Sequence, residues 1–211
     1  MSRVEPAQKP SRRDQARATK ARIVDAAAEL FVQRGYGTTT LGQIADQADV
    51  AVQTVYFHFG NKRTVLKAAV DRATVGDDEP VALLDRPWME RVRSEADPVR
   101  LIELWVRAGR DIFVRSAAIM SVVRDAAAED PEMAEQWSLN EQQRLEAFRI
   151  VAELLDERGA LATGMSVDRA TDVIFTLNSV EVYLLLTSTR GWSAQEWQHW
   201  LSATLVATLL D

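Results

Sequence analysis

The 211-residue chain contains no cysteine and only two histidines. The missing cysteine excludes disulfide bridges, thiolate metal ligands and a thiol nucleophile, and it is typical of a reducing compartment. The first twenty residues lack the apolar core that a secretory signal peptide needs. The apolar run at residues 182–186 is too short to cross a bilayer. We therefore expect a cytoplasmic protein with no membrane segment.

Signatures of common enzyme classes are missing as well. The chain has no glycine-rich dinucleotide-binding or phosphate-binding loop and no nucleophile elbow. Glu196 and His199 have the spacing of a di-iron helix, but such a site needs that pair twice and two further glutamates. Val55 stands where the other histidine, His58, would need its glutamate. We expect no enzyme activity, no cofactor and no metal site, while catalysis by scattered carboxylates stays open.

Charge is unevenly distributed along a chain whose composition, 47% hydrophobic and 27% charged, is that of a globular protein. Residues 1–75 contain 12 basic and 7 acidic side chains and all four lysines, whereas residues 76–211 contain 13 basic and 24 acidic side chains. This asymmetry suggests that only the N-terminal part meets a polyanion such as nucleic acid. Chance, with each charge on a solvated face, is the alternative interpretation.

Apolar residues recur at helical spacing, and we find neither strand-like alternation nor an internal repeat, so the predicted fold class is all-α. Glycines, prolines and capping residues divide the chain. They predict helices near residues 20–34, 40–48, 52–58, 62–75, 98–115, 117–129, 131–158, 167–190 and 194–210. We expect a flexible basic arm over residues 1–16, a small helical domain over 17–75 and a larger one over 76–211.

Two of these helices, residues 40–48 and 52–58, are short and joined by a turn of three residues. That spacing is typical of a helix-turn-helix unit, although an unrelated helical pair can share it. Such a unit places its second helix in the major groove of DNA, which is about 12 Å wide and accepts one helix.

Side chains of the second short helix have the chemistry for this task. Gln53 and Thr54 stand at its front, where base edges are reached: glutamine can pair with adenine, and threonine can use its hydroxyl or methyl group. Tyr56 and His58 can donate hydrogen bonds to phosphate oxygens. Lys62 lies at the start of the next helix, where its charge and the free backbone N–H groups favour phosphate.

The N-terminal part also contains the run ARIVDAAAELFVQRGYGTTTLGQIADQADVAVQTVYFHFGNKRTVLKAAV. Residues 19–71, which include it, resemble the N-terminal domain of TetR-family transcriptional regulators. Residues 190–210, RGWSAQEWQHWLSATLVATLL, are more weakly similar to the last helix of many members. Residues 76–189 show no motif of the family.

The resemblance implies an N-terminal three-helix DNA-binding domain followed by a larger helical ligand-binding and dimerisation domain. It implies a homodimer that binds a palindromic operator, usually as a repressor. A small molecule would release this dimer from DNA by favouring a form whose recognition helices no longer match the half-site spacing. By family position the DNA contacts fall on Thr40, Gln43, Val52, Gln53, Thr54, Tyr56, His58 and Lys62.

Two positions depart from the family pattern. Asp49 stands where the turn usually has glycine, and Ala51 stands where the second short helix usually has a serine or threonine cap. We hypothesise that Asp49 caps the helix instead.

The predicted helices at residues 167–190 and 194–210 are largely apolar and must be covered by other parts of the protein. They can fill their own subunit's core, and the resemblance implies that they also form a four-helix dimer interface. An effector cavity should be concave and mostly apolar with a few polar groups. The candidates are Trp88, Trp105, Phe113, Met120, Trp137, Phe148, Phe175, Asn178 and Tyr183, with Arg107 or Glu181 to orient the ligand.

We expect an apolar or aromatic effector, with Trp105 and Asn178 as the first-choice contacts. The other function class that fits is a helical-bundle protein, a small-molecule binder or an enzyme, whose N-terminal domain only resembles a DNA reader. Binding to DNA that weakens steeply with salt distinguishes the two.

Overall fold

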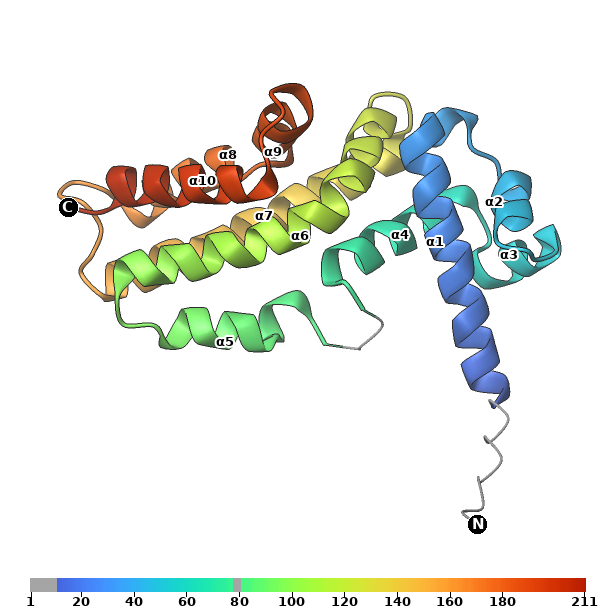
Figure 1. Cartoon of the computed structure of the whole chain (residues 1–211), viewed down its shortest axis with the longest axis horizontal. Coiled ribbons are helices and arrows are strands. Elements are labelled where there is room, and N and C mark those ends of the chain that lie inside the picture. Colours follow the sequence, from blue (N-terminus) through green and yellow to red (C-terminus); the bar gives the residue numbers. More distant parts are fainter. Residues whose placement is uncertain (1–10, 78–80) are drawn as a thin grey trace, which may run out of the picture. The chain divides into compact units, whose positions relative to one another are not determined.

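The computed structural model describes residues 11–77 and 81–211 (Figure 1). These residues form helices and no β-sheet, and an isolated backbone bridge pairs Leu161 with Leu210. The chain divides into two compact units, of which the first ends at Ala69 and the second begins at Val70. The predicted all-α fold is confirmed.

The first unit contains three helices and the start of a fourth. They are α1 (Arg12–Thr38), α2 (Leu41–Gln47), α3 (Val52–Phe59) and α4 (Lys62–Val75), the last of which continues into the second unit. Each helix contributes apolar side chains to a common core. Its largest fully buried members are Ile23, Phe31, Ile44 and Leu66.

The first helix begins earlier than the apolar periodicity predicts. The Ser11 hydroxyl accepts a hydrogen bond from the Asp14 backbone N–H, and the Asp14 carboxylate accepts bonds from the backbone and hydroxyl of Ser11. This capping box starts α1 at Arg12, so residues 12–16 are helical and not part of the predicted arm. Residues 1–10 of that arm lie outside the described residues. Regular helix ends at Gly35, as predicted, where φ is 79°.

The second unit is built around two long helices, α6 (Pro98–Ala127) and α7 (Pro131–Glu157), which lie side by side in Figure 1. Each begins with proline at its first position after an aspartate cap, Asp97 or Asp130. The remaining elements of the unit are η1 (Leu83–Asp85), α5 (Pro87–Ser94), α8 (Val167–Leu177), α9 (Val180–Leu184), the π-helical turn η2 (Leu185–Thr189) and α10 (Ala194–Leu209).

Two predicted boundaries in the second unit are wrong. Residues 98–115 and 117–129 form a single helix, α6, because the buried Ser116 hydroxyl donates to the Ile112 carbonyl and leaves the helix intact. Conversely, residues 167–190 do not form one helix. Asn178 leaves the helical conformation, and the Ser179 hydroxyl accepts a hydrogen bond from the Val182 N–H to start α9.

Candidate nucleic-acid interface and ligand cavity

Helices α2 and α3 form the predicted helix-turn-helix unit. The Thr40 hydroxyl accepts a hydrogen bond from the Gln43 N–H, and the Gln43 side chain accepts one from the Thr40 N–H, so a capping box starts α2. In the turn, the Val50 N–H donates to the Ala45 carbonyl at 3.0 Å. The inner face of α3 packs into the core of the unit through the buried side chains of Val55 and Phe59. The opposite face, which includes Gln53, Tyr56 and Phe57, is therefore on the surface of the unit.

The predicted cap at Asp49 is wrong. α3 starts at Val52 after Ala51, which supplies no capping side chain. Asp49 instead occupies the left-handed region, with φ of 52°, at the position where the family usually has glycine. Aspartate tolerates that region better than most residues, so the turn forms without glycine.

The outer face of α3 exposes two large aromatic side chains. Tyr56 is 55% exposed and Phe57 is 84% exposed, and Gln53 lies on the same exposed side. Phe57 was not among the residues predicted to contact DNA. It could have been found, because Val55 and Phe59, four residues apart, already account for the buried face and leave Phe57 outside.

The eight predicted DNA-contact residues all lie in the first unit, on α2, α3, their caps and the start of α4. Thr40, Gln53 and Tyr56 are exposed, whereas Gln43, Val52, Thr54, His58 and Lys62 are partly buried. Lys62 is also held by its own unit. Its ammonium donates to the Tyr36 carbonyl at 2.7 Å and lies 4.2 Å from the centre of the Tyr36 ring, so it joins the start of α4 to the end of α1.

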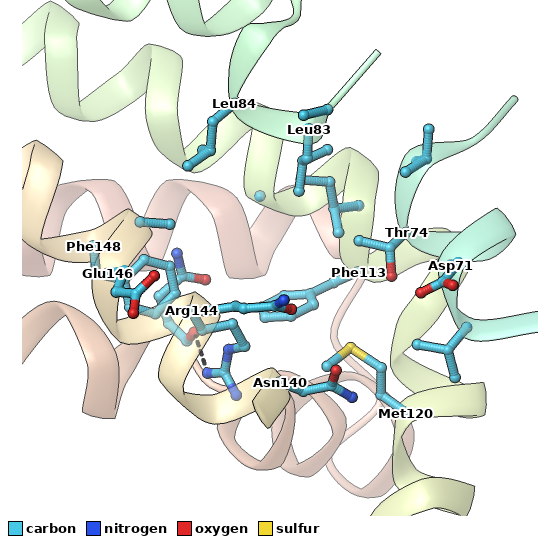
Figure 2. Close-up of a pocket in the computed structure, with 18 of the residues that line it drawn as sticks. Asp71, Thr74, Leu83, Leu84, Phe113, Met120, Asn140, Arg144, Glu146 and Phe148 are labelled. Carbon is cyan, nitrogen blue, oxygen red and sulfur yellow. Dashed lines mark hydrogen bonds between the residues drawn. The ribbon is translucent and has the colours of Figure 1, made fainter. Parts of the chain in front are cut away.

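The second unit contains a cavity of about 440 Å³, within the range of small-molecule sites (Figure 2). Its walls come from the last residues of α4, from η1 and α5, and from α6 and α7, and Asn178 closes it at the break between α8 and α9. In Figure 2, Leu83 and Leu84 lie on the opposite side of the cavity from Asn140 and Met120.

Aromatic rings form a continuous wall of this cavity. The ring centre of Trp105 is 5.8 Å from that of Trp88 and 5.7 Å from that of Phe148. Phe113 lines the cavity farther along α6 and packs 5.2 Å from Tyr183, which lies behind it. Such a wall can hold an apolar or aromatic ligand.

Six predicted effector residues line the cavity, and the others do not. The lining six are Trp88, Trp105, Phe113, Met120, Phe148 and Asn178. Phe175 and Tyr183 pack behind the wall, Trp137 lies elsewhere on α7, and the exposed Arg107 does not reach the cavity. Glu181 is also outside it and pairs with Arg124 at 3.4 Å.

The structure adds polar lining residues that sequence reasoning missed, above all Asn140 and Arg144. They precede Phe148 at successive four-residue steps on α7, a spacing that puts all three side chains on one face. Burial lowers the pKa of the Arg144 guanidinium from its usual value, against the opposing influence of Glu181 and Glu141. A cation therefore lies in the wall of a mostly apolar cavity.

A metal site at Glu196 and His199 has no support in the structure. The Glu196 carboxylate accepts hydrogen bonds from the backbone and hydroxyl of Ser193 and so caps α10, which holds its pKa below the usual value. Among the described residues, no three histidine or acidic side chains come together as metal ligands do.

Known proteins resemble both units. Residues 23–69 match the family described as "Bacterial regulatory proteins, tetR family". The chain is 25% identical over 177 residues to the HTH-type transcriptional repressor BepR of Brucella suis, an alignment that covers 79% of this chain and 80% of BepR. It is 46% identical over 88 residues to the HTH-type transcriptional regulator SrpR of Pseudomonas putida, covering 40% of this chain but only 41% of SrpR.

A solved complex of SmeT with triclosan has the same fold, with a TM-score of 0.72 and 20% identity over 92% of each chain. The relatives are named as transcriptional regulators, which sets aside the alternative of a helical-bundle enzyme. The helix-turn-helix unit, the family match over that unit and the shared fold of the second unit agree. The chain is therefore a member of the TetR family of bacterial transcriptional regulators.

Proposed function

We propose that this regulator is a repressor that binds a palindromic DNA operator as a homodimer, and that a small apolar or aromatic molecule in the cavity releases it. One observation carries the proposal: α4 belongs to both units. It starts at Lys62 in the first unit, and its last residues, among them Val70, Asp71 and Thr74, line the cavity. A ligand that moves the end of α4 acts on a helix that starts next to α3 in the chain.

Named relatives support this proposal. BepR is named as a repressor, and SmeT has been solved with the small molecule triclosan. Release by a ligand requires that the ligand and DNA weaken each other's binding by the same factor. A regulator of this kind acts where its DNA lies, so we infer a cytoplasmic location.

We assign DNA-contact roles by chemistry and exposure. Gln53 and Thr54 read base edges, and Tyr56, His58 and Lys62 contact phosphates. Thr40, Gln43 and Val52 complete the set by their family positions. The exposed Phe57 ring is a further contact, because an apolar side chain can pack on a thymine methyl group.

The proposed dimer is supported by apolar surface that one chain leaves uncovered. By length and mean hydropathy the stretch Val167–Thr189 is apolar enough to span a membrane, yet only 39% of its most apolar window is buried within the chain. The break at Asn178 interrupts it as a helix. On α10, the exposed positions His199, Ala203 and Ala207 recur every four residues, and the two alanines allow a second helix to approach closely.

A partner subunit packed on α8 and α10 would cover both surfaces. A symmetric dimer would then set two α3 helices about 34–36 Å apart, one turn of DNA.

We retain a DNA-binding domain up to residue 75 and an effector-binding and dimerisation domain (76–211) as part of the proposal, and we do not retain the predicted arm (1–16), because α1 already starts at Arg12. The compact units meet earlier, between Ala69 and Val70, because the end of α4 packs with the second unit. For instance, the Arg115 guanidinium on α6 donates to the carbonyls of Ala73 and Thr74.

The experiment that tests the proposed function is fluorescence anisotropy of the purified protein on DNA that flanks its own coding region. Random DNA of equal length is the comparison. Tight, salt-sensitive binding with a clear preference for the flanking DNA is the expected result. Equal and weak binding to both DNAs, with and without cavity ligands, would argue against a local repressor.

A further inference from the structure

Four side chains that line the cavity carry a buried polar atom with no hydrogen-bond partner in the described part of the chain. The atoms are Trp105 Nε1, Asn140 Nδ2, Arg144 Nε and Asn178 Oδ1. Buried polar groups are normally paired, and a group left unpaired is destabilising. Their concentration around one cavity indicates that a bound molecule completes their hydrogen bonds.

The chemistry of these groups is biased towards donors. An indole N–H and a guanidinium N–H can only donate, so Trp105 and Arg144 both require an acceptor. At Asn140 the unpaired atom is the donor Nδ2, since Oδ1 already accepts from the Gln136 amide, whereas at Asn178 it is the acceptor Oδ1. The ring centre of Phe148 lies 5.7 Å from that of Trp105 and 5.6 Å from the Arg144 guanidinium carbon, so the two obligatory donors flank the same ring.

The positive charge of Arg144 is not neutralised by a direct ion pair. Its Nη2 donates to the Asn178 backbone carbonyl at 3.1 Å, the dashed line in Figure 2, and its guanidinium carbon lies 5.1 Å from the centre of the Phe175 ring. No carboxylate of the described residues comes within 4 Å of that guanidinium. Glu181, which acts on it from farther away, is paired with Arg124.

We propose that the cavity binds an apolar monocarboxylic acid, whose carboxylate accepts hydrogen bonds from Arg144 and Trp105 and whose body lies against the aromatic wall. This inference rests on the proposed function, because it names the chemical class of the effector. A carboxylate is an acceptor-only anion and supplies what both donors and the cation need.

The remaining lining residues limit the ligand to a single charge. Asp71 and Glu146 also line the cavity, so further negative groups on a ligand would meet carboxylates. Figure 2 shows Asp71 with Thr74 on the side away from Arg144 and Phe148, whereas Glu146 lies beside Phe148 on the same side as Arg144. The apolar middle of the cavity stays available for the body of the acid. A polyphosphate or a dicarboxylate is therefore a poor match.

The test compares ligands that share one body and differ in charge. The probes are 2-naphthoic acid and biphenyl-4-carboxylic acid, each with its primary amide and its aminomethyl counterpart, titrated by calorimetry into the full-length protein. We expect at least one acid to bind at least tenfold more tightly than its amide, and the amines to bind most weakly. Amides or amines that bind as tightly as the acids, or a failure of both acids to bind, would overturn the inference.

Variants of Arg144 separate ligand recognition from a structural role. Arg144→Met keeps the unbranched apolar stem of the side chain but removes the guanidinium group and its charge. It should cost the acids at least tenfold in affinity, leave the amides unchanged, and leave the melting temperature of the free protein unchanged or higher. Arg144→Lys, which keeps the charge, should retain part of the preference for acids. Arg107→Met is the matched control, because Arg107 is exposed and does not line the cavity.

A lower melting temperature of Arg144→Met together with equal loss of acid and amide binding would show a structural role and refute the proposal. DNA anisotropy keeps this result separate from the proposed function. Specific DNA binding that an amide releases would support the proposed function and refute the carboxylic acid as the ligand class. Acid binding without specific DNA binding would support the ligand class and refute the proposed function.

Discussion

The two units depart from the usual arrangement of side chains in opposite directions. In the first unit, α3 turns aromatic rings outwards: Phe57 is 84% exposed and Tyr56 is 55% exposed. In the second unit, polar atoms of Trp105 and Arg144 point inwards and lack partners. Each departure is destabilising for the free chain, since water meets apolar surface in one case and is withheld from polar atoms in the other.

Under the two proposals, each departure marks a surface that a partner of a different kind completes. In the proposed function, a DNA groove supplies phosphates, base edges and methyl groups to the exposed face of α3. In the proposed ligand complex, a small acceptor-bearing molecule supplies what the donors of the cavity lack. Experiment can separate the two surfaces, since each perturbation is expected to act on one and spare the other.

Salt is expected to have the largest effect, and only on the first unit. A dimer that neutralises about six to ten phosphates should lose roughly 10³–10⁵ in DNA affinity between about 50 and 200 mM salt. Ligand binding in the cavity, measured by calorimetry over the same range, should change far less, because a buried ion pair is poorly screened. A flat salt dependence on DNA would exclude phosphate anchoring.

The next largest effect is expected from Gln53→Ala. Loss of a base contact should cost about 1–3 kcal/mol, concentrated at one base pair of the operator. Anisotropy on a set of single-position operator variants measures this. Gln33→Ala, an exposed glutamine on α1 outside the helix-turn-helix unit, is the control. Equal loss on operator and random DNA would contradict a role for Gln53 in base readout.

Phe57→Ala tests the exposed ring itself. Because the ring is already in water, thermal stability should not fall, whereas operator affinity should drop by about 1–2 kcal/mol from the apolar surface no longer buried against DNA. Val55→Ala is the opposite case on the same helix, since Val55 is fully buried and its truncation should lower stability. A loss of stability in Phe57→Ala would show that the ring packs inside the protein.

Arg115→Ala tests how the cavity communicates with α4. Arg115 follows the lining residues Ile112 and Phe113 on α6 and donates to two carbonyls in the last turn of α4, at 3.2 Å each. Without it, a cavity ligand such as 2-naphthoate should still bind but should weaken DNA binding less, by about tenfold. Arg100→Ala, an exposed arginine on the same helix, should leave the coupling intact. Unchanged coupling in Arg115→Ala would exclude this route.

The same contrast explains how much could be predicted from the sequence. The helix-turn-helix unit was predictable because local signals set it: Thr40 caps α2, and Val55 and Phe59 mark the buried face of α3. The break between α8 and α9 was not predictable. Ser179, whose hydroxyl caps α9, stands in an apolar run that also fits a continuous helix.

The apolar part of the cavity and one of its polar residues, Asn178, were predictable, whereas its other polar residues were not. Large aromatic residues of the second unit are natural candidates for the lining. However, Trp137 and Tyr183 are aromatic as well and do not line the cavity. Arg144 was missed because the residues that share its cavity wall, such as Trp105 and Asn178, come from distant segments of the chain. Their meeting depends on how α6, α7 and α8 pack, and local periodicity contains no information on that.

Asp49→Gly should have the smallest effect of these changes, and its effect on stability should be confined to the first unit. Asp49 has a φ of 52°, a conformation that costs a side-chain-bearing residue roughly 1–2 kcal/mol, less for aspartate. Glycine removes that cost but gains freedom in the unfolded chain, so a net stabilisation of about 0.5 kcal/mol is expected. Asp49→Ala should instead destabilise the unit.

All six tryptophans lie in the second unit, so the two units can be monitored separately in one sample. Amide hydrogen exchange in α2 and α3 should slow in Asp49→Gly and quicken in Asp49→Ala, while the unfolding midpoint seen by tryptophan fluorescence stays constant. If Asp49→Ala exchanged as slowly as Asp49→Gly, the left-handed turn would carry no cost at this position. The departure from the family glycine would then be neutral rather than a small loss that the turn's other contacts, such as the Val50 to Ala45 hydrogen bond, offset.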